Sequence, residues 1–564
     1  MKLSQQLALL ALLVPAAVHA ADVPFERRLP DRISGFVSIP DFGAFKERFV
    51  KTSYGRMLDD PQIATFRSQV EKVIRTAATR DNVLPSGIEI EDLLEVVSGE
   101  VALAATLPKN GSASLIFSLE FGESLDTVEK LIDEISDKAV EEGWEEGVVE
   151  FQGSSISTFA GPADDTRPEQ VPNTLALVIE ESTLIVSTSV ELCQDVLDRR
   201  DGTADGSLAT NEVFRHVIDS TSDRNRIPGM TWYLSIADLI QSAFASADPT
   251  NMLLNVARGN IGRVGILEWR GMGGTFDMAT DGFDSISRTC AWIDDPVTGV
   301  LSVFTFPVDD LVPPPWVPAD SAMYITANWD IERAYNSVET LWDTIMGRGS
   351  FSAGIQKLAA DENGPGINIK LDVVDILDGR QHLLQASLPE DAGDEESGAV
   401  VVAMEVTDTE KAEQLLDRID GQPGSPLESR TYRDTKIWSL ETGVAFAVAH
   451  DCLLFSSTVA QLESVIRADP DITSLADDKD FQHSISRMPP RVSLMGVQQS
   501  VQQMRMIYNL IRTYIPAGND GPDPSTLPEF EAIKHYFLTG VSYAVPNAQG
   551  FEYVTYTLDE DVSR

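Results

Sequence analysis

One segment of this chain occurs twice. Shifted by 269 positions, the apolar run Leu184–Val190 lies over Leu453–Val459, and both runs lead into a helical pattern. After a two-residue deletion the offset becomes 267, and six of the twelve positions in Ser207–Ile218 are identical in the second copy. These identities are Ser-Leu-Ala, Phe, His and Ile. The chain is therefore predicted to be duplicated, so that one fold must suit both copies.

The first twenty residues predict a cleaved export signal. Lys2 precedes an apolar run from Leu7 to Val18 that is too short to span a bilayer, and Val18-His19-Ala20 suits signal peptidase. The mature chain should begin near Ala21. No Cys follows to accept a lipid, and no later stretch has 18 apolar residues, so neither a lipid anchor nor a membrane span is expected. We expect a soluble protein in the periplasm or outside the cell.

The length and composition of the remainder predict several globular domains. The mature chain, about 544 residues, exceeds the length at which a single core stops growing. With 43% hydrophobic residues, it can also bury substantial cores. The predicted division is a signal peptide at 1–20, a first repeat at 21–300, a Pro-rich linker at 301–318 and a second repeat at 319–564.

Charge excludes one class of partner. The chain has 43 Lys and Arg against 88 Asp and Glu, a net charge of −45. Such a surface repels phosphate backbones and anionic lipid head groups, and no basic stripe overrides it, so nucleic acid is not expected as a partner. The acidity is most simply explained by solubility.

The three cysteines, Cys193, Cys290 and Cys452, are too few for a disulfide framework. In the alignment of the two copies, Cys193 lies over Leu462 and Cys290 over Leu558. They are expected to be small core residues rather than nucleophiles or metal ligands.

The order of elements predicts an α+β fold in two tandem copies, each a mostly antiparallel sheet with packed helices. Each copy begins with a short strand and a helical region. Phe45 and Phe49 in the first copy, and Val338, Leu341, Trp342 and Ile345 in the second, recur at helical spacing. We expect both stripes to face a core.

A hairpin, another helix and further strands follow in each copy. Gly99–Pro108 leads through an Asn-Gly-Ser turn into Leu115–Phe121, and Gly379–Pro389 leads through an acidic loop into Val400–Val406. Apolar strands at this spacing are expected to pair antiparallel. Pro313-Pro314-Pro315 lies between the copies and should interrupt regular structure.

This order resembles a family of exported bacterial proteins, domain of unknown function 3352. The resemblance rests on Leu29-Pro30-Asp31 before the first strand, and on Ser474-Leu475-Ala476 followed by Phe481 and Pro489-Pro490. It spans both repeats. It implies export and this architecture, and it supplies no catalytic residues.

Motifs of common catalytic sites are incomplete. Ser350–Gly354 lacks the first glycine of a nucleophile elbow and follows a predicted helix. The histidines never occur in the i, i+4 pair that binds zinc. Among them, His216 and His483 recur at equivalent places, and a capping or polar packing role is favoured for both over an acid-base role. We expect a protein that is not an enzyme.

One loop has the spacing of a calcium site. Asp201, Thr203, Asp205 and Glu212 occupy loop positions 1, 3, 5 and 12, with Gly206 at position 6, nearly as in an EF-hand. The second copy, Asp469–Asp480, lacks that glycine. The alternative is a loop between helices in which Asn211 or Asp478 caps the following helix. No other cofactor is predicted.

The leading functional hypothesis is an exported, non-enzymatic binding or scaffold protein of the bacterial cell envelope. One alternative is a carrier of an apolar ligand such as a lipid, enclosed by the sheets and helices. Another is a calcium-stabilised exported protein. The partner is thus an envelope protein or an apolar ligand, and the sequence leaves its identity and the oligomeric state open.

Overall fold

The computed structural model describes residues 23–70, 96–107, 113–161, 174–223, 226–246, 250, 258–360, 366–385, 399–422, 424–467, 473–514 and 523–559. The predicted signal peptide, the turn between the first hairpin strands and the acidic loop at 390–396 lie outside these residues. The chain forms two compact units. Unit 1 comprises Met1–Asn255, Trp269–Ile293 and Leu510–Tyr536, and unit 2 comprises Val256–Glu268, Asp294–Asn509 and Phe537–Arg564.

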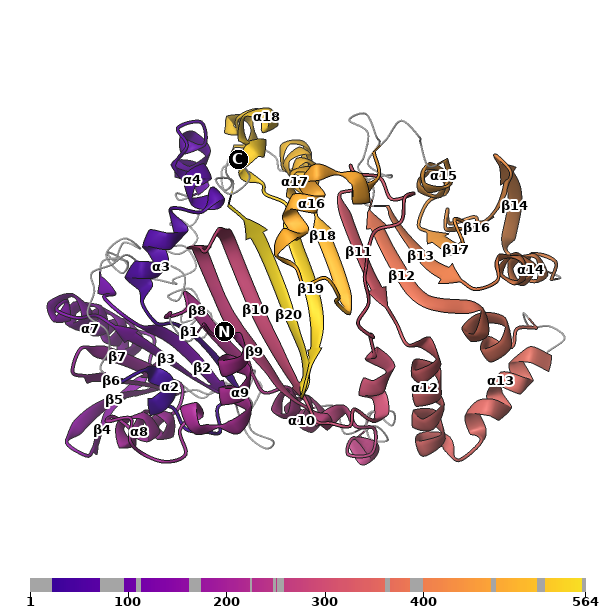
Figure 1. Cartoon of the computed structure of the whole chain (residues 1–564). Helices are drawn as coiled ribbons and strands as arrows, with labels where there is room; N and C mark the ends of the chain where they lie inside the picture. The colour runs from indigo at the N-terminus through magenta and orange to yellow at the C-terminus, as the bar shows by residue number, and fades with distance from the viewer. Residues whose placement is uncertain are drawn as a thin grey trace. The chain divides into compact units, whose positions relative to one another are not determined.

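Unit 1 contains an antiparallel sheet with the strand order β4-β5-β6-β7-β3-β2-β1-β8-β9-β10 (Figure 1). The described strands are β1 (Gly35–Ile39), β2 (Val101–Thr106), β3 (Ser114–Glu120), β4 (Glu145–Phe151), β5 (Ser154–Ala160), β6 (Thr174–Glu180), β7 (Thr183–Ser187), β8 (Met230–Leu234), β9 (Trp269–Thr280) and β10 (Phe283–Ile293).

Unit 2 contains an antiparallel sheet with the order β14-β15-β16-β17-β13-β12-β11-β18-β19-β20. The described strands are β11 (Met323–Asn328), β12 (Leu377–Gln385), β13 (Val400–Val406), β14 (Leu427–Tyr432), β15 (Thr435–Leu440), β16 (Ala445–Ala449), β17 (Cys452–Ser456), β18 (Leu494–Gln498), β19 (Gly540–Asn547) and β20 (Gly550–Leu558). The two sheets thus pair their strands in the same order.

The register of pairing also agrees between the units. In unit 1, Ser187 of β7 lies opposite Ile116 of β3, and in unit 2 Ser456 of β17 lies opposite Val401 of β13. Both predicted hairpins form, since β2 pairs with β3 and β12 with β13. Each unit is therefore α+β, as predicted.

Helices cover both faces of the unit 1 sheet. Phe36 and Ile116 on one face lie in a core with residues of α2, α8 and α9, whereas Phe117 and Val186 on the other face lie in a core with residues of α3 and α7. The helices of unit 1 include α2 (Phe25–Arg28), α3 (Phe42–Phe49), α4 (Ser53–Asp59), α7 (Leu125–Glu141), α8 (Val190–Asp198), α9 (Glu212–Thr221), α10 (Ile236–Ser246) and α18 (Phe530–Ile533).

The sheet of unit 2 is covered in a similar way. Its two cores contain residues of α15 and α16 on one side and of α14 on the other. Helices of unit 2 include α12 (Ile331–Met346), α13 (Ser350–Ala360), α14 (Thr409–Asp420), α15 (Val459–Arg467), α16 (Lys479–Ser484) and the first ten residues of α17 (Ser500–Tyr514).

Several predictions about individual residues are confirmed. Cys193, Cys290 and Cys452 are buried free thiols, and burial raises the pKa of Cys193 to about 12. Asn211 caps α9 and Asp478 caps α16, each through its side chain. The Pro-rich segment contains no strand, but its last residues are not an exposed linker: Leu311, Trp316 and Val317 belong to a core of unit 2.

The prediction that the helical stripe of the second copy faces a core is wrong for Val338, Trp342 and Ile345. Val338, Trp342 and Ile345 of α12 are exposed by 38%, 47% and 39%, and only Ile331 and Ala334 in the first turns of this helix are buried. Periodicity gave the correct helix but not the correct environment, because a helical stripe shows that one face is apolar and not that anything covers it.

Candidate functional site

The candidate calcium site lies in the loop Asp201–Glu212 of unit 1. Backbone hydrogen bonds hold this loop in place. The Asp201 carboxylate accepts a hydrogen bond from the backbone N–H of Thr203 at 3.0 Å, which lowers the pKa of Asp201. The backbone N–H of Asp31 donates to the Gly206 carbonyl at 2.9 Å, and that of Leu208 donates to the Leu29 carbonyl at 2.9 Å. The loop is therefore fastened to the segment before β1 without a metal ion.

The structure does not gather the predicted ligands. Within the described residues, no three Asp, Glu, His or Cys side chains are placed to hold one metal ion, so Asp205 and Glu212 do not converge with Asp201. Glu212 instead opens α9, directly after the capping Asn211. Thr203 contributes its backbone N–H to a hydrogen bond within the loop. Calcium binding by this loop stays a prediction.

The recurring histidines lie partly inside their units. The imidazole of His216 packs edge-on against Trp292 with ring centroids 4.6 Å apart. The Nε2 atoms of His216 and His483 are both buried without a hydrogen-bond partner in the structure. We expected a polar environment for His216, but its ring instead contacts the ring of Trp292. Among the described residues, neither histidine lies beside a group of metal ligands.

A buried polar network occupies the sheet of unit 2. The Tyr324 hydroxyl lies 2.8 Å from Nδ1 of His382, and Nε2 of His382 lies 3.2 Å from the Glu405 carboxylate. The three residues come from adjacent strands β11, β12 and β13. The side chain of His382 is fully buried, and the indole of Trp316 packs edge-on against it at 5.6 Å.

The hydrogen bonds of this network pair both nitrogens of the ring. Tyr324 contacts Nδ1 and Glu405 contacts Nε2, so every polar atom of the imidazole has a partner. The hydrogen bond from His382 lowers the pKa of Glu405, and burial raises the pKa of Tyr324. The network is closed to solvent at His382, so the arrangement explains packing specificity better than chemistry on a substrate.

The equivalent place in unit 1 holds different chemistry. By strand pairing, Ala102 corresponds to His382 and Glu120 to Glu405. Glu100, next to Ala102 on this face, accepts hydrogen bonds from the backbone N–H of Phe25 at 2.9 Å and from the Ser38 hydroxyl. Desolvation, followed by repulsion from Glu26, raises the pKa of Glu100 to about 7. This carboxyl fastens α2 to the sheet.

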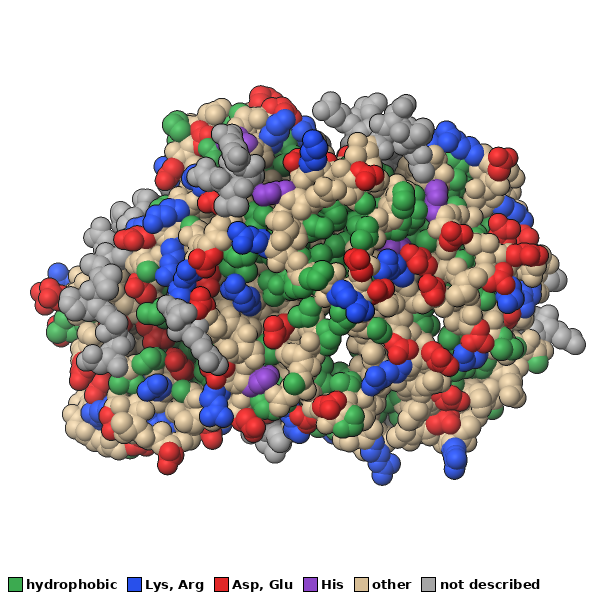
Figure 2. Space-filling view, in the orientation of Figure 1, with side chains coloured by type: hydrophobic (Ala, Val, Ile, Leu, Met, Phe, Trp, Pro, Cys, Tyr) green, Lys and Arg blue, Asp and Glu red, His purple; other side chains and the backbone are tan. Residues whose placement is uncertain are grey.

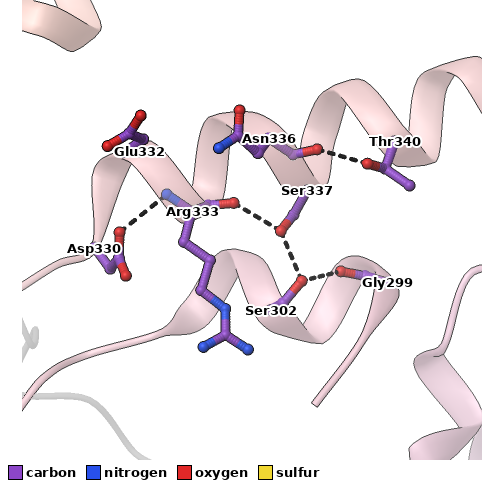
Figure 3. Close-up of a pocket in the computed structure, with 8 residues that line it drawn as sticks. All are labelled: Gly299, Ser302, Asp330, Glu332, Arg333, Asn336, Ser337 and Thr340. Atoms are coloured by element: carbon purple, nitrogen blue, oxygen red, sulfur yellow. Dashed lines mark hydrogen bonds between the residues drawn. The ribbon is translucent and has the colours of Figure 1, made fainter. Parts of the chain in front are cut away.

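A polar cavity of about 420 Å³ lies between α12 and the 3-10 helix Gly299–Phe304 (Figure 3). The hydroxyl oxygens of Ser302 and Ser337 lie 2.7 Å apart and join the two helices across its floor. The lining residues are Gly299, Ser302, Asp330, Glu332, Arg333, Asn336, Ser337 and Thr340. Every lining residue except Gly299 has a polar side chain.

The feature that stands apart is a helical hairpin formed by α12 and α13 on unit 2 (Figure 1). No residue of α13 is buried. Five large hydrophobic side chains of this hairpin are exposed by 37% to 63%. We call them the hairpin patch: Val338, Trp342, Ile345, Met346 and Leu358. In the rest of the described chain, the exposed large hydrophobic residues that recur most closely are Val50, Tyr54 and Leu58 of unit 1.

The turn of the hairpin is well ordered by hydrogen bonds. The Asp343 carboxylate accepts from the backbone N–H groups of Gly349 and Phe351, and these bonds lower the pKa of Asp343. Phe351 packs edge-on against Tyr335 at 5.5 Å, which joins the two helices. The patch is therefore presented by a fixed element rather than by a loose loop.

The comparison with known families concerns this same part of the chain. A model described as "Protein of unknown function (DUF3352)" matches residues 317–498. This segment is similar to that family. The match confirms the resemblance seen in the sequence, and the matched residues include both the buried network and the hairpin. No curated protein and no solved structure matches the chain.

Proposed function

We propose that the protein is an exported, non-enzymatic binding protein of the bacterial cell envelope, built from two copies of one α+β module. Export is supported by the signal pattern of residues 1–20. No described helix has the length and apolarity needed to cross a bilayer. Figure 2 shows acidic side chains spread over the visible face rather than gathered in one patch.

The duplication is supported by the common topology of the two sheets. An identical order of pairing over many strands, with equivalent serines at Ser187 and Ser456, is improbable unless one module gave rise to both. The modules then diverged inside, as Ala102 and His382 show. We infer that one copy became the scaffold and the other acquired the binding surface.

The hairpin patch is the single observation that carries the binding function. Exposed apolar side chains that occur singly need no explanation, whereas several on one pair of helices favour an interaction site. The corresponding helices of unit 1 differ, because Phe42 of α3 is buried and Phe45 packs against the same core. In unit 1 the exposed apolar side chains of the helical region after β1 are Val50, Tyr54 and Leu58, a smaller set without a tryptophan.

Envelope fractionation tests this proposal. The wild-type chain is expected in the envelope fraction of its host, and the paired variant I345D/M346D in the soluble fraction. A matched control is I227D in unit 1, since Ile227 is 59% exposed but lies outside the hairpin. Equal distribution of wild type and I345D/M346D would remove the support for a hairpin-dependent binding function.

A further inference from the structure

We infer that the partner of the hairpin patch is the surface of an anionic lipid bilayer. This inference rests on the proposed function and identifies its partner. The hairpin would lie in the interfacial region, with its apolar side chains below the headgroups and its cationic side chains among them. Shape, apolarity and local charge each contribute to the argument.

The shape of the hairpin permits insertion. Gly347 and Gly349 adopt positive φ angles of 105° and 79° in the turn, and a side chain added at either position would meet no atom within 4 Å. Met346, beside this turn, is 63% exposed. The tip therefore projects from unit 2, and Asp343 holds it in one conformation before any partner arrives.

The composition of the patch suits a membrane interface. Trp342 is 47% exposed on the same stripe as Ile345, and tryptophan is enriched where bilayers meet water. Leu358 adds an apolar side chain from the second helix. Two helices that present apolar residues around one turn can bury that turn in lipid without placing an unpaired helix backbone there.

Charge complementarity decides the type of surface. The segment Thr344–Ala360 contains Arg348 and Lys357, both exposed, and no Asp or Glu, within a chain of net charge −45; acidic residues resume at Asp361. Basic residues beside an apolar face favour anionic headgroups, whereas the acidic remainder is repelled by them. The segment Thr344–Ala360 is thus the part of the hairpin that suits an anionic bilayer, whereas α12 before it contains Glu332, Glu339 and Asp343.

A second copy of the chain is the less favoured occupant. A symmetric dimer formed through the hairpin would bring Arg348 and Lys357 of both copies to one interface, and two chains of net charge −45 also repel each other. A bilayer brings no second set of cations to the interface.

Vesicle flotation with the purified full-length chain tests the inference. We expect binding to vesicles of phosphatidylcholine with phosphatidylglycerol, weakened by salt, and little binding to phosphatidylcholine alone. The affinity of I345D/M346D for anionic vesicles should be at least about tenfold lower than that of wild type. R348E/K357E should lose the preference for anionic vesicles. I227D should bind as wild type, and matching thermal melts would show that all variants fold.

Three results would overturn the inference. The first is that wild type binds neither kind of vesicle. The second is that it binds and the hairpin variants bind equally well. The third is that wild type self-associates in sedimentation and I345D/M346D does not. The last result would assign the patch to contact between copies. Absence of vesicle binding together with hairpin-dependent envelope fractionation would point to a protein partner, so that the proposed function survives and the lipid inference falls.

Discussion

At the scale of single residues, buried ionisable groups distinguish two otherwise similar sheets. In unit 2 the chain Tyr324–His382–Glu405 satisfies every polar atom of a buried imidazole. In unit 1 the carboxyl of Glu100 receives hydrogen bonds but also faces the charge of Glu26. The first arrangement pairs its groups, whereas the second becomes costly as pH rises.

Replacing His382 with Ala should destabilise the protein by about 2–4 kcal/mol, because it leaves a cavity and removes the partner of the buried Tyr324 hydroxyl and of the partly exposed Glu405 carboxylate. Urea unfolding of the two proteins measures the difference. The control H535A removes an exposed imidazole and should change the free energy of unfolding by less than about 0.5 kcal/mol. A small effect of H382A would show that the network contributes little to stability.

Glu100 should make stability depend on pH. Its folded-state pKa of about 7 lies above the ordinary 4.5, so its contribution is fully present below pH 4.5 and is lost as pH rises through about 7. The free energy of unfolding of E100Q minus that of wild type should increase by roughly 3 kcal/mol from pH 4 to pH 8. Unfolding at both pH values measures this change. The control E123Q alters an exposed carboxyl and should show no such trend.

At the scale of elements, α12 has two parts with different roles. Its first turns are anchored by the buried Ile331 and Ala334, whereas the following stripe is open to solvent. The loop Asp201–Glu212 shows the opposite case, a segment with metal-like spacing in which several backbone groups make structural hydrogen bonds.

Substitutions along α12 should therefore separate stability from binding. I345D/M346D should lower the free energy of unfolding by less than about 1 kcal/mol, because both side chains are already exposed. A334D should cost about 3 kcal/mol or more, since it buries a charge without a partner. Thermal melts of the two variants provide the comparison, and a large loss in I345D/M346D would mean that the stripe is packed in solution.

The loop Asp201–Glu212 should respond little to calcium. The carboxylates of Asp205 and Glu212 do not converge with that of Asp201 in the structure, so we expect the melting temperature to be the same with chelator and with added calcium. A rise of several degrees with calcium, lost in D201N, would instead establish a site that forms only with the ion bound.

At the scale of the whole molecule, the sequence was most informative where neighbours along the chain decide the structure. Helix caps at Asn211 and Asp478 and the hairpin of β2 with β3 were predictable because their partners lie a few residues apart. The network of Tyr324, His382 and Glu405 was not, since its members are brought together only by strand register. The period-2 pattern that places His382 on the same face as the buried Leu384 was the available signal.

The exposed stripe of α12 was unpredictable for a related reason. The spacing of Val338, Trp342 and Ile345 is that of a core-facing helix, and only the fold reveals that all three remain exposed, although Trp342 contacts Phe351 of α13. Sequence pattern reports apolarity, whereas burial depends on what the rest of the chain leaves available. The same residues therefore changed from expected core to proposed binding surface.

The most direct test of that surface uses a dye at the hairpin tip. The native cysteines are buried, so M346C can be labelled selectively with an environment-sensitive fluorophore, and I227C serves as the control position. With anionic vesicles, the emission at position 346 should shift to shorter wavelength and that at position 227 should stay unchanged. An unchanged spectrum at position 346, or equal shifts at both positions, would contradict insertion of the hairpin.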